Sequence, residues 1–290
     1  KGEFYKVFTP YKNTWIDTYK GQKISEFKTE KYFENFYKGN HAFPDLEQIG
    51  FKKAKISFPK PQLSPSFLKG YEKKRNFPAE EGTSRVGVYL RFGVLSIREL
   101  TKIAAQHSET FLNELIWREF YMMILANNPH VVNNAFKKDY DNIEWQNNKE
   151  LFEKWKSGKT GYPIVDAGMR QLNESGYMHN RVRMVTASFL SKHLLIDWRW
   201  GEAYFGEKLL DYELSSNNGG WQWAAGTGTD AQPYFRVFNP ESQQKKFDAN
   251  LEYTKHWVPE LETDDYPEPV IDHKFARERA IDTYKKSLGK

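Results

Sequence analysis

The chain has 290 residues, 39% of them hydrophobic, a net charge of +5 and no cysteine. Its length can bury a large core in one or two domains, and the lack of cysteine excludes disulfides and thiolate metal sites. The longest apolar runs fall short of the roughly 20 residues that cross a bilayer, and the histidines lack metal-binding spacing. We therefore expect neither a membrane span nor a metal centre.

The first part of the chain reads as irregular and tyrosine-rich, and the proline-rich run FPKPQLSP at 58–65 reads as a linker. After the linker, apolar residues recur with helical spacing, and continuous β alternation is hard to find. The sequence therefore predicts an all-α body. The expected helices cover residues 92–106, 108–126, 148–157, 163–174, 179–196, 198–214 and 272–287.

The segment EGTSRVGVYL at 81–90 has the pattern of a helix start, because Thr83 and Ser84 precede an apolar run. Free N–H groups and hydroxyls at such a start bind phosphate well. A simple N-cap explains the same residues, so both interpretations stay open.

Two of the predicted helices carry polar stripes. Within 111–126, Glu114, Trp117, Arg118 and Tyr121 share one face, which forms either a capped surface or the polar corner of an aromatic pocket. Within 179–196, the stripe contains Asn180, Arg183, Met184 and Ala187. If Arg183 is buried, it requires a carboxylate, and Asp211 or Glu213 is the expected supplier; otherwise Arg183 faces solvent.

The segment 217–240, NNGGWQWAAGTGTDAQPYFRVFNP, places Trp221, Trp223, Tyr234 and Phe235 among glycines, amides and threonines. This mixture is unlike an ordinary structural element, and we interpret it as the lining of an aromatic site. Lysines also cluster at 52–60 and 69–74. They suit a phosphate backbone, although on charge alone a solvated surface is the favoured explanation.

Six motifs, taken in order, resemble the photolyase/cryptochrome family. They are EGTSR at 81–85, NELIWREFY at 113–121, GYPIVDAGMRQL at 161–172, MHNRVRMVTASFL at 178–190, LLIDWRWGEAYF at 194–205 and the segment 217–240. The pattern MHNRVRM is most similar to class I photolyases of cyclobutane pyrimidine dimers. The similarity covers roughly residues 65–290.

The resemblance implies a helical FAD-binding and lesion-binding domain over 65–290. Residues 1–64 would form the interdomain linker and the start of the helical region, since KVFTPYKNTW at 6–15 resembles the sequence that follows the family's α/β antenna domain. We expect that antenna domain and its chromophore to be absent, and we expect a monomer. Because no signal peptide opens the sequence, we expect an intracellular protein, cytoplasmic if bacterial.

The resemblance also implies roles for single residues. FAD would be held by Tyr71, Thr83, Ser84, Arg85, Val86, Gly87, Phe111, Asn180, Arg183, Asp211, Glu213 and Asn217, with Asn217 facing flavin N5. The flipped-out lesion in UV-damaged DNA would contact Glu114, Trp117, Asn180, Met184 and Trp223. The DNA rim would consist of Arg75, Arg118, Arg181 and Gln243.

Trp221, Trp198 and Trp145 match the family's electron-transfer chain, with Trp200 and Trp155 as alternative relays or all five as core aromatics. Glu213 and Gly87 depart from the family pattern, where an aspartate and a serine are usual. Three functions remain open at this point: light-driven repair of DNA, a cryptochrome photoreceptor, and a basic DNA-binding module without a cofactor.

Overall fold

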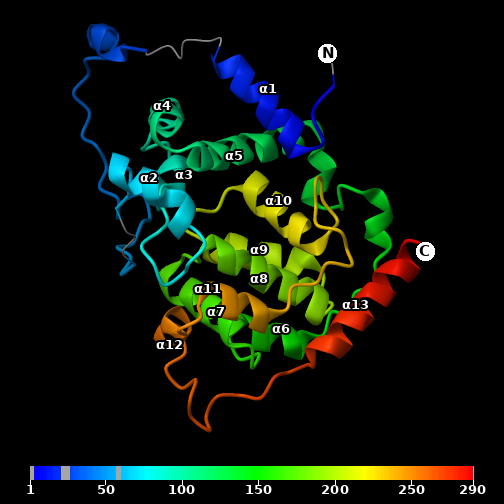
Figure 1. The fold of residues 1–290 in the computed structure, drawn as a ribbon. Coiled ribbons are helices and arrows are strands. Elements are labelled where there is room, and N and C mark those ends of the chain that lie inside the picture. The colour runs from blue at the N-terminus through cyan, green and yellow to red at the C-terminus, as the bar shows by residue number, and fades with distance from the viewer. Residues whose placement is uncertain (1–2, 21–26, 57–59, 290) are drawn as a thin grey trace.

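A computed structural model describes residues 3–20, 27–56 and 60–289, and this part of the chain is helical and contains no strand (Figure 1). The all-α prediction is confirmed. None of the described helices is long and apolar enough to span a bilayer. The α-helices are α1 Phe8–Lys20, α2 Pro65–Lys74, α3 Gly87–Arg91, α4 Ile97–His107, α5 Glu109–Asn127, α6 Lys149–Lys156, α7 Pro163–Ser175, α8 Asn180–Ser188, α9 Trp198–Lys208, α10 Leu214–Ala225, α11 Pro240–Phe247, α12 Glu252–Trp257 and α13 His273–Ser287. Short helical turns occur at η1 Thr29–Asn35, η2 Pro129–Val132, η3 Lys138–Asn142 and the π-helical η4 Phe189–His193.

Local capping explains several helix boundaries. Ser108 starts α5 by accepting a hydrogen bond from the backbone N–H of Phe111 at 3.2 Å, and Asn148 starts α6 in the same way. Gly176 ends α7 in the left-handed conformation, with φ of 66°. Helices α5, α6, α7 and α13 lie within two residues of their predicted ranges.

Three other predicted ranges were too long. Helix α4 begins only at Ile97 because Gly93, with φ of 68°, forms a turn in front of it. The range 179–196 changes at Phe189 from an α-helix into a π-helical turn. Helix α9 ends at Lys208, and residues 209–213 connect it to α10.

The N-terminal part is less irregular than its sequence suggested, because Phe8–Lys20 forms α1. Phe8, Tyr11 and Trp15 recur at helical spacing, and Pro10 is tolerated in the first turn. Phe8 and Tyr11 pack their rings against Phe120 of α5 at 5.8 and 5.4 Å. Residues 27–56 instead form an arm with exposed aromatic side chains (Figure 1).

The glycine- and tryptophan-rich segment is partly an ordinary helix, although we expected its composition to be unlike an ordinary structural element. Residues 214–225 form α10, and a Cβ added at Gly219 would lie 2.2 Å from Tyr121. A Cβ at Gly201 would likewise lie 2.1 Å from Trp221. These glycines therefore allow helices to approach aromatic side chains of the same protein.

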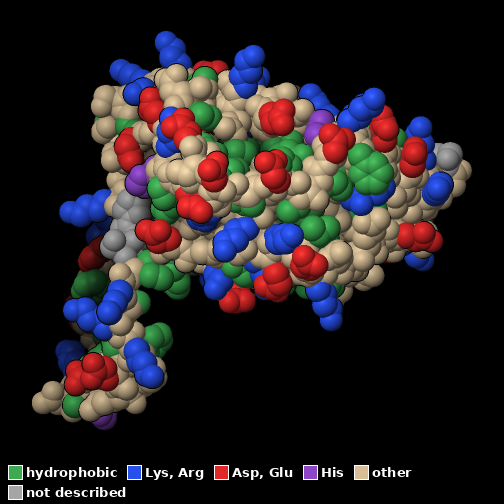
Figure 2. All heavy atoms as spheres, turned by 90° about the horizontal axis from the view of Figure 1, so that it is seen from below, with side chains coloured by type: hydrophobic (Ala, Val, Ile, Leu, Met, Phe, Trp, Pro, Cys, Tyr) green, Lys and Arg blue, Asp and Glu red, His purple; other side chains and the backbone are tan. Residues whose placement is uncertain are grey.

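Two large hydrophobic clusters organise the described residues, beside a small third cluster of Ile143, Leu195, Ala280 and Tyr284. One is formed mainly by α1, α2, α4 and α5, and the other by α6–α10 with α12. Figure 1 shows α1 and α5 on one side, α6 and α7 on the other, and α8, α9 and α10 between them. Helix α10 packs on α5, α8 and α9, so it joins the two clusters. On the face shown in Figure 2, basic and acidic side chains are interspersed, which makes this face a poor candidate for binding a polyanion.

Candidate functional site

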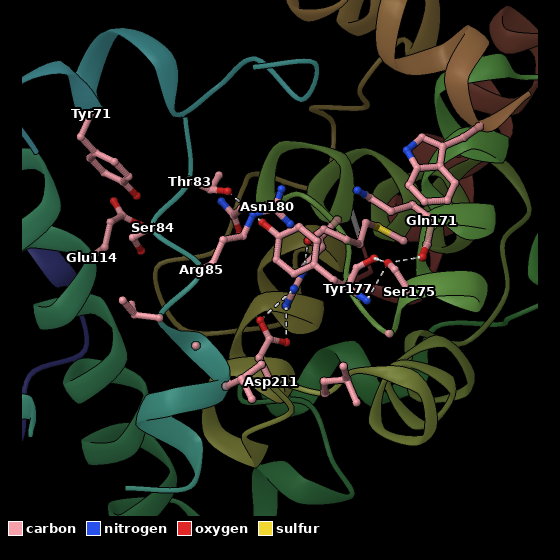
Figure 3. A pocket seen from close by; sticks show the side chains of 18 residues that line it. Tyr71, Thr83, Ser84, Arg85, Glu114, Gln171, Ser175, Tyr177, Asn180 and Asp211 are labelled. Atoms are coloured by element: carbon pink, nitrogen blue, oxygen red, sulfur yellow. Dashed lines mark hydrogen bonds and ion pairs between the residues drawn. The ribbon is translucent and has the colours of Figure 1, made fainter. Parts of the chain in front are cut away.

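Two adjoining cavities, of about 380 and 400 Å³, lie between the two hydrophobic clusters. Glu114 from α5, Asn180 and Arg183 from α8, and Asp211 before α10 line both cavities. The site is therefore one continuous region built by helices that are distant in sequence. Figure 3 shows the first cavity, with Tyr71 and Glu114 on one side and Tyr177 and Asp211 on the other.

Arg183 is held by Asp211 through two hydrogen bonds, 3.2 Å to Oδ1 and 2.9 Å to Oδ2. Its Nε also donates to the carbonyl of Met178 at 2.7 Å. Burial opposes the charge of Arg183, but Asp211 outweighs burial, and the pKa of the guanidinium is raised. The prediction that Arg183 pairs with a carboxylate is confirmed, and Asp211 is the partner.

Glu213 is not the partner of Arg183. Its carboxylate is the N-cap of α10 and accepts hydrogen bonds from the N–H and hydroxyl groups of Ser215 and Ser216, at 2.6–3.0 Å. Burial raises the pKa of Glu213, but these hydrogen bonds outweigh it and lower the pKa overall. Glu213 lines the second cavity with a carboxylate that is already used to cap the helix.

Arg85 shapes the wall of the first cavity together with Thr83 and Ser84. Its backbone is left-handed, with φ of 56°, and its guanidinium lies over the Tyr177 ring at 4.2 Å. The Arg85 Nε is buried and has no hydrogen-bond partner among the described residues. Tyr177 also donates from its hydroxyl to Thr83 Oγ1 at 3.2 Å. The cavity thus offers an unused cationic donor.

Thr83 and Ser84 do not start a helix, so that prediction was wrong. Helix α3 begins at Gly87, and Val86 precedes it without a side-chain cap. A Cβ at Gly87 would lie 2.9 Å from Asp211 Oδ2. The close approach of Asp211 therefore explains why a glycine stands where relatives are expected to have a serine.

Asn217 lies on the wall of the second cavity with one end of its amide fixed. Its Nδ2 donates to the carbonyl and to Oε1 of Glu202, at 3.0 and 2.8 Å. Burial raises the pKa of Glu202. Because the NH₂ group is engaged, the amide oxygen is the atom left to interact with a ligand.

Glu114 forms the polar corner that we considered for α5. Its Oε1 accepts a hydrogen bond from Nη1 of Arg75 at 2.5 Å. Trp117, Met184 and Trp223 line the second cavity beside it. Asn180 lines the same cavity, so all five predicted lesion contacts lie around it.

The predicted DNA rim is divided by the structure. Arg75 and Arg118 line the second cavity. Arg181 lies outside the two cavity linings, donates to Asn76 Oδ1 at 2.8 Å and covers the Phe247 ring at 4.3 Å. Gln243 also lies outside the linings, and its buried Oε1 has no partner in the part of the chain that the structure describes.

Phe111 does not belong to either cavity wall. It is 2% exposed, lies in the cluster around α5 and packs edge-on against Tyr71 at 5.1 Å. Enclosure by the protein's own residues does not support direct contact between Phe111 and the cofactor, which stays a prediction.

The tryptophans form a branching set. Trp221 lines the second cavity and meets Trp155 at 6.0 Å between ring centroids. Phe152 connects Trp155 to Trp200, at 5.7 and 5.2 Å. Trp198 is buried, and Trp145 is half-buried against Tyr284 at 5.9 Å. Close ring contacts thus favour the alternative relay through Trp155.

Sequence reasoning missed one side of the first cavity and the residue behind Asn217. Tyr177 directly precedes MHNRVRM, and Glu202 lies within LLIDWRWGEAYF, so both stood next to recognised motifs. The other missed residues come from α3, from α7 and the turn after it, from the connection before α10 and from the end of α12. The missed lining of the first cavity comprises Val88, Gln171, Ser175, Gly176, Tyr177, Met178, Leu210 and Trp257.

The residues present fit a dinucleotide with a flat ring system, as FAD has. The two joined cavities provide room, the buried Arg85 Nε provides an unpaired donor for an anion, and Asn217 provides a free amide oxygen. Trp221 and Trp223 line the second cavity with apolar surface. The same cavities contain no cluster of three side chains that could hold a metal ion among the residues described here.

Known proteins resemble the chain over most of its length. A family described as the FAD binding domain of DNA photolyase matches residues 111–264. The deoxyribodipyrimidine photo-lyase of Vibrio cholerae is 40% identical over 100% of this chain and 70% of its own length. The enzyme of the same name from Escherichia coli is 41% identical over 97% of this chain and 68% of its own length.

Solved structures agree. A class III photolyase from Agrobacterium tumefaciens has a TM-score of 0.73 at 40% identity, covering 77% of this chain and 53% of that protein. A cryptochrome from Synechocystis has a TM-score of 0.73 at 29% identity, covering 85% of this chain and 61% of its own. The chain therefore spans a little over half of these two structures. It belongs to the photolyase/cryptochrome family and contains the FAD-binding domain of a DNA photolyase.

Proposed function

We propose that this domain repairs UV-damaged DNA by splitting cyclobutane pyrimidine dimers in a light-driven reaction. The observation that carries the proposal is the second cavity, where Glu114, Trp117, Met184 and Trp223 surround a space that also contains Asn217. Lesion-binding and cofactor-binding residues thus share one wall. The match to the FAD binding domain of DNA photolyase argues against a DNA-binding module without a cofactor.

FAD would be held by the residues that line the two joined cavities. Thr83, Ser84 and Arg85 supply hydroxyl and cationic donors for its phosphates in the first cavity, and Asn217 presents its amide oxygen in the second. Arg183 and Asp211 line both cavities and hold each other in place. When bound, reduced and excited by light, FAD would supply an electron to the dimer and take it back after the two bonds joining the pyrimidines break, so that the splitting needs no net oxidant or reductant.

The remaining residues of the second cavity would bind the extruded lesion. Trp117 and Trp223 offer flat apolar surfaces, and Glu114 offers a carboxylate within reach of a pyrimidine base. Photolyases act on a base taken out of the stack, and a damaged pair costs less to extrude than an intact one. This cavity therefore selects damage without reading sequence.

Arg75 and Arg118 would contribute positive charge beside the lesion, although Arg75 is also bound to Glu114. Arg181 and Gln243 would contact the DNA backbone at the outer rim. Trp221 and Trp155 would carry electrons from the protein surface to the bound flavin and so restore its reduced state, with Trp198 and Trp145 as a second branch.

We also propose that the domain works as a monomer in the cytoplasm, with residues 65–290 forming the site. All residues that line the two cavities fall between 71 and 257 of one chain, which supports this division. Size-exclusion chromatography with light scattering tests the monomer, and a dimer that persists at nanomolar concentration would contradict it.

Illumination of dimer-containing DNA with the purified flavoprotein tests the repair function. We expect light-dependent loss of dimers, and Glu114→Ala should slow repair by roughly 10- to 100-fold with FAD retained, because a hydrogen bond to a charged group is lost. The matched control is Glu119→Ala, which removes a carboxylate from the outer face of the same helix. If the protein binds FAD but illumination does not lower the amount of dimer in the DNA, the result would favour a photoreceptor instead.

A further inference from the structure

Phe8 lies parallel to Trp117, although 109 positions separate them in the sequence. Their ring centroids are 3.6 Å apart and their planes differ by 8°. Phe120 meets Trp117 edge-on at 5.5 Å, and Tyr121 meets it at 5.4 Å. Phe8 thus covers one face of the indole, and the neighbouring rings restrict its edges.

The position of Phe8 is fixed by more than its own ring. It is 8% exposed, and its backbone N–H donates to Asp230 Oδ2 at 3.1 Å. The hydroxyl of Thr229 donates to the carbonyl of Lys6 at 2.6 Å. The start of α1 is therefore tied to the loop that follows α10, and through Phe8 to the back of Trp117.

Trp117 lines the second cavity, so its uncovered face is the only broad surface that it can offer to a ligand. An indole that must be ordered on binding loses part of its affinity to rotamer entropy, whereas an indole that is already held does not. The contacts of Phe8 supply that order before any ligand arrives.

We propose that Phe8 is a positioning residue for damaged DNA, which fixes Trp117 with one face open to the extruded pyrimidine. This inference rests on the proposed repair function. Helix α1, whose sequence is typical of a linker, would then contribute to selecting the lesion. Phe8 itself lines neither of the two cavities, so it acts only through Trp117.

The test is a double-mutant cycle between Phe8→Leu and Trp117→Ala, measured as affinity for an oligonucleotide with one thymine dimer and for the same oligonucleotide undamaged. Leucine keeps apolar volume but removes the flat ring. We expect Phe8→Leu to weaken dimer binding about 3- to 10-fold, which corresponds to the ordering of one side chain. Affinity for undamaged DNA, FAD content and the repair yield per photon at saturating DNA should not change.

In the Trp117→Ala background, Phe8→Leu should cause no further loss of dimer affinity. Two more variants complete the experiment. Asp230→Ala, which releases the Phe8 backbone while keeping its ring, should give a smaller loss that also disappears without Trp117, and it serves if Phe8→Leu does not fold. Trp15→Phe is the control, because it removes the hydrogen bond from α1 to Glu119 without touching Trp117, and it should leave dimer affinity unchanged.

Equal losses from Phe8→Leu with and without Trp117 would overturn the inference, since Phe8 would then act through the fold. Unchanged dimer affinity in Phe8→Leu would overturn it as well. If the unaltered protein shows no preference for dimer-containing DNA, the proposed function itself fails, and that result is distinguishable from the other two.

Discussion

The pair of Arg183 and Asp211 holds the centre of the site together, and removing its carboxylate tests this directly. The two side chains are 25% and 15% exposed, and both line both cavities. Asp211→Ala leaves a largely buried guanidinium without its partner. Breaking a fully buried pair costs about 3–5 kcal/mol, and partial exposure reduces this to about 2–4 kcal/mol.

For a chain of this length, unfolding entropy near 60 °C is about 0.6 kcal/mol per degree. The melting temperature of Asp211→Ala should therefore fall by about 3–7 °C. Because Asp211 also orients a guanidinium in the cofactor site, the variant should lose most of its FAD. Thermal unfolding and the ratio of flavin to protein after purification measure the two effects.

A second arginine–carboxylate pair provides the matched control. Arg170 donates to both oxygens of Glu260, at 2.9 and 2.6 Å, and the side chains are 20% and 29% exposed. Neither residue lines either of the two cavities described above. Glu260→Ala should lower the melting temperature by a similar or slightly smaller amount and keep its FAD. The reasoning is refuted if Asp211→Ala retains FAD, or if Glu260→Ala loses it to the same extent.

Three further predictions concern the relay, a buried lysine and a glycine. Trp155→Phe should slow photoreduction of the bound flavin more than Trp198→Phe, because Trp155 has the close contact with Trp221; equal rates measured by absorbance under illumination with a reductant would remove this distinction. Lys192 is buried, and desolvation lowers its pKa from 10.5 to about 7, so the folded protein favours the neutral amine. The stability gained from this preference is complete above pH 10.5 and is lost as the pH falls to about 7. Urea unfolding at several pH values should show the free energy of unfolding rising by up to about 1.4 kcal/mol per pH unit over this range, and Lys192→Met should flatten that rise; parallel curves would contradict the assignment. Gly219→Ala should destabilise the protein by about 1–3 kcal/mol, because the added methyl group would overlap with Tyr121. Gly220 has open space around it, so Gly220→Ala should stabilise α10 by up to about 1 kcal/mol. If thermal unfolding shows a change of the same sign for both variants, packing around the glycine does not determine the effect of the substitution.

Local signals in the sequence predicted much of the fold. The apolar period predicted the place of α5 to within one residue, and the need of a buried guanidinium for a carboxylate narrowed the partner of Arg183 to Asp211 or Glu213. Both inferences rest on rules that operate within one helix or on one charge. They do not require knowledge of which helices pack together.

Tertiary contacts decided the features that could not be predicted. The sequence presents Gly219 as part of the lining of an aromatic site, because its packing partner, Tyr121, is about 100 positions away in the chain. Phe111 shares helix α5 with the cavity residues Glu114 and Trp117, yet its side chain is buried in the core. The stacking of Phe8 on Trp117 has no local signal, since neither residue's own segment reveals the other.

The most direct test of the central claim is the lifetime of flavin fluorescence in the reduced protein, measured with and without dimer-containing DNA. If the second cavity holds the lesion beside FAD, the lifetime should shorten when dimer-containing DNA is added and stay constant with undamaged DNA. A lifetime unaffected by saturating dimer-containing DNA would contradict a shared site for the cofactor and the lesion.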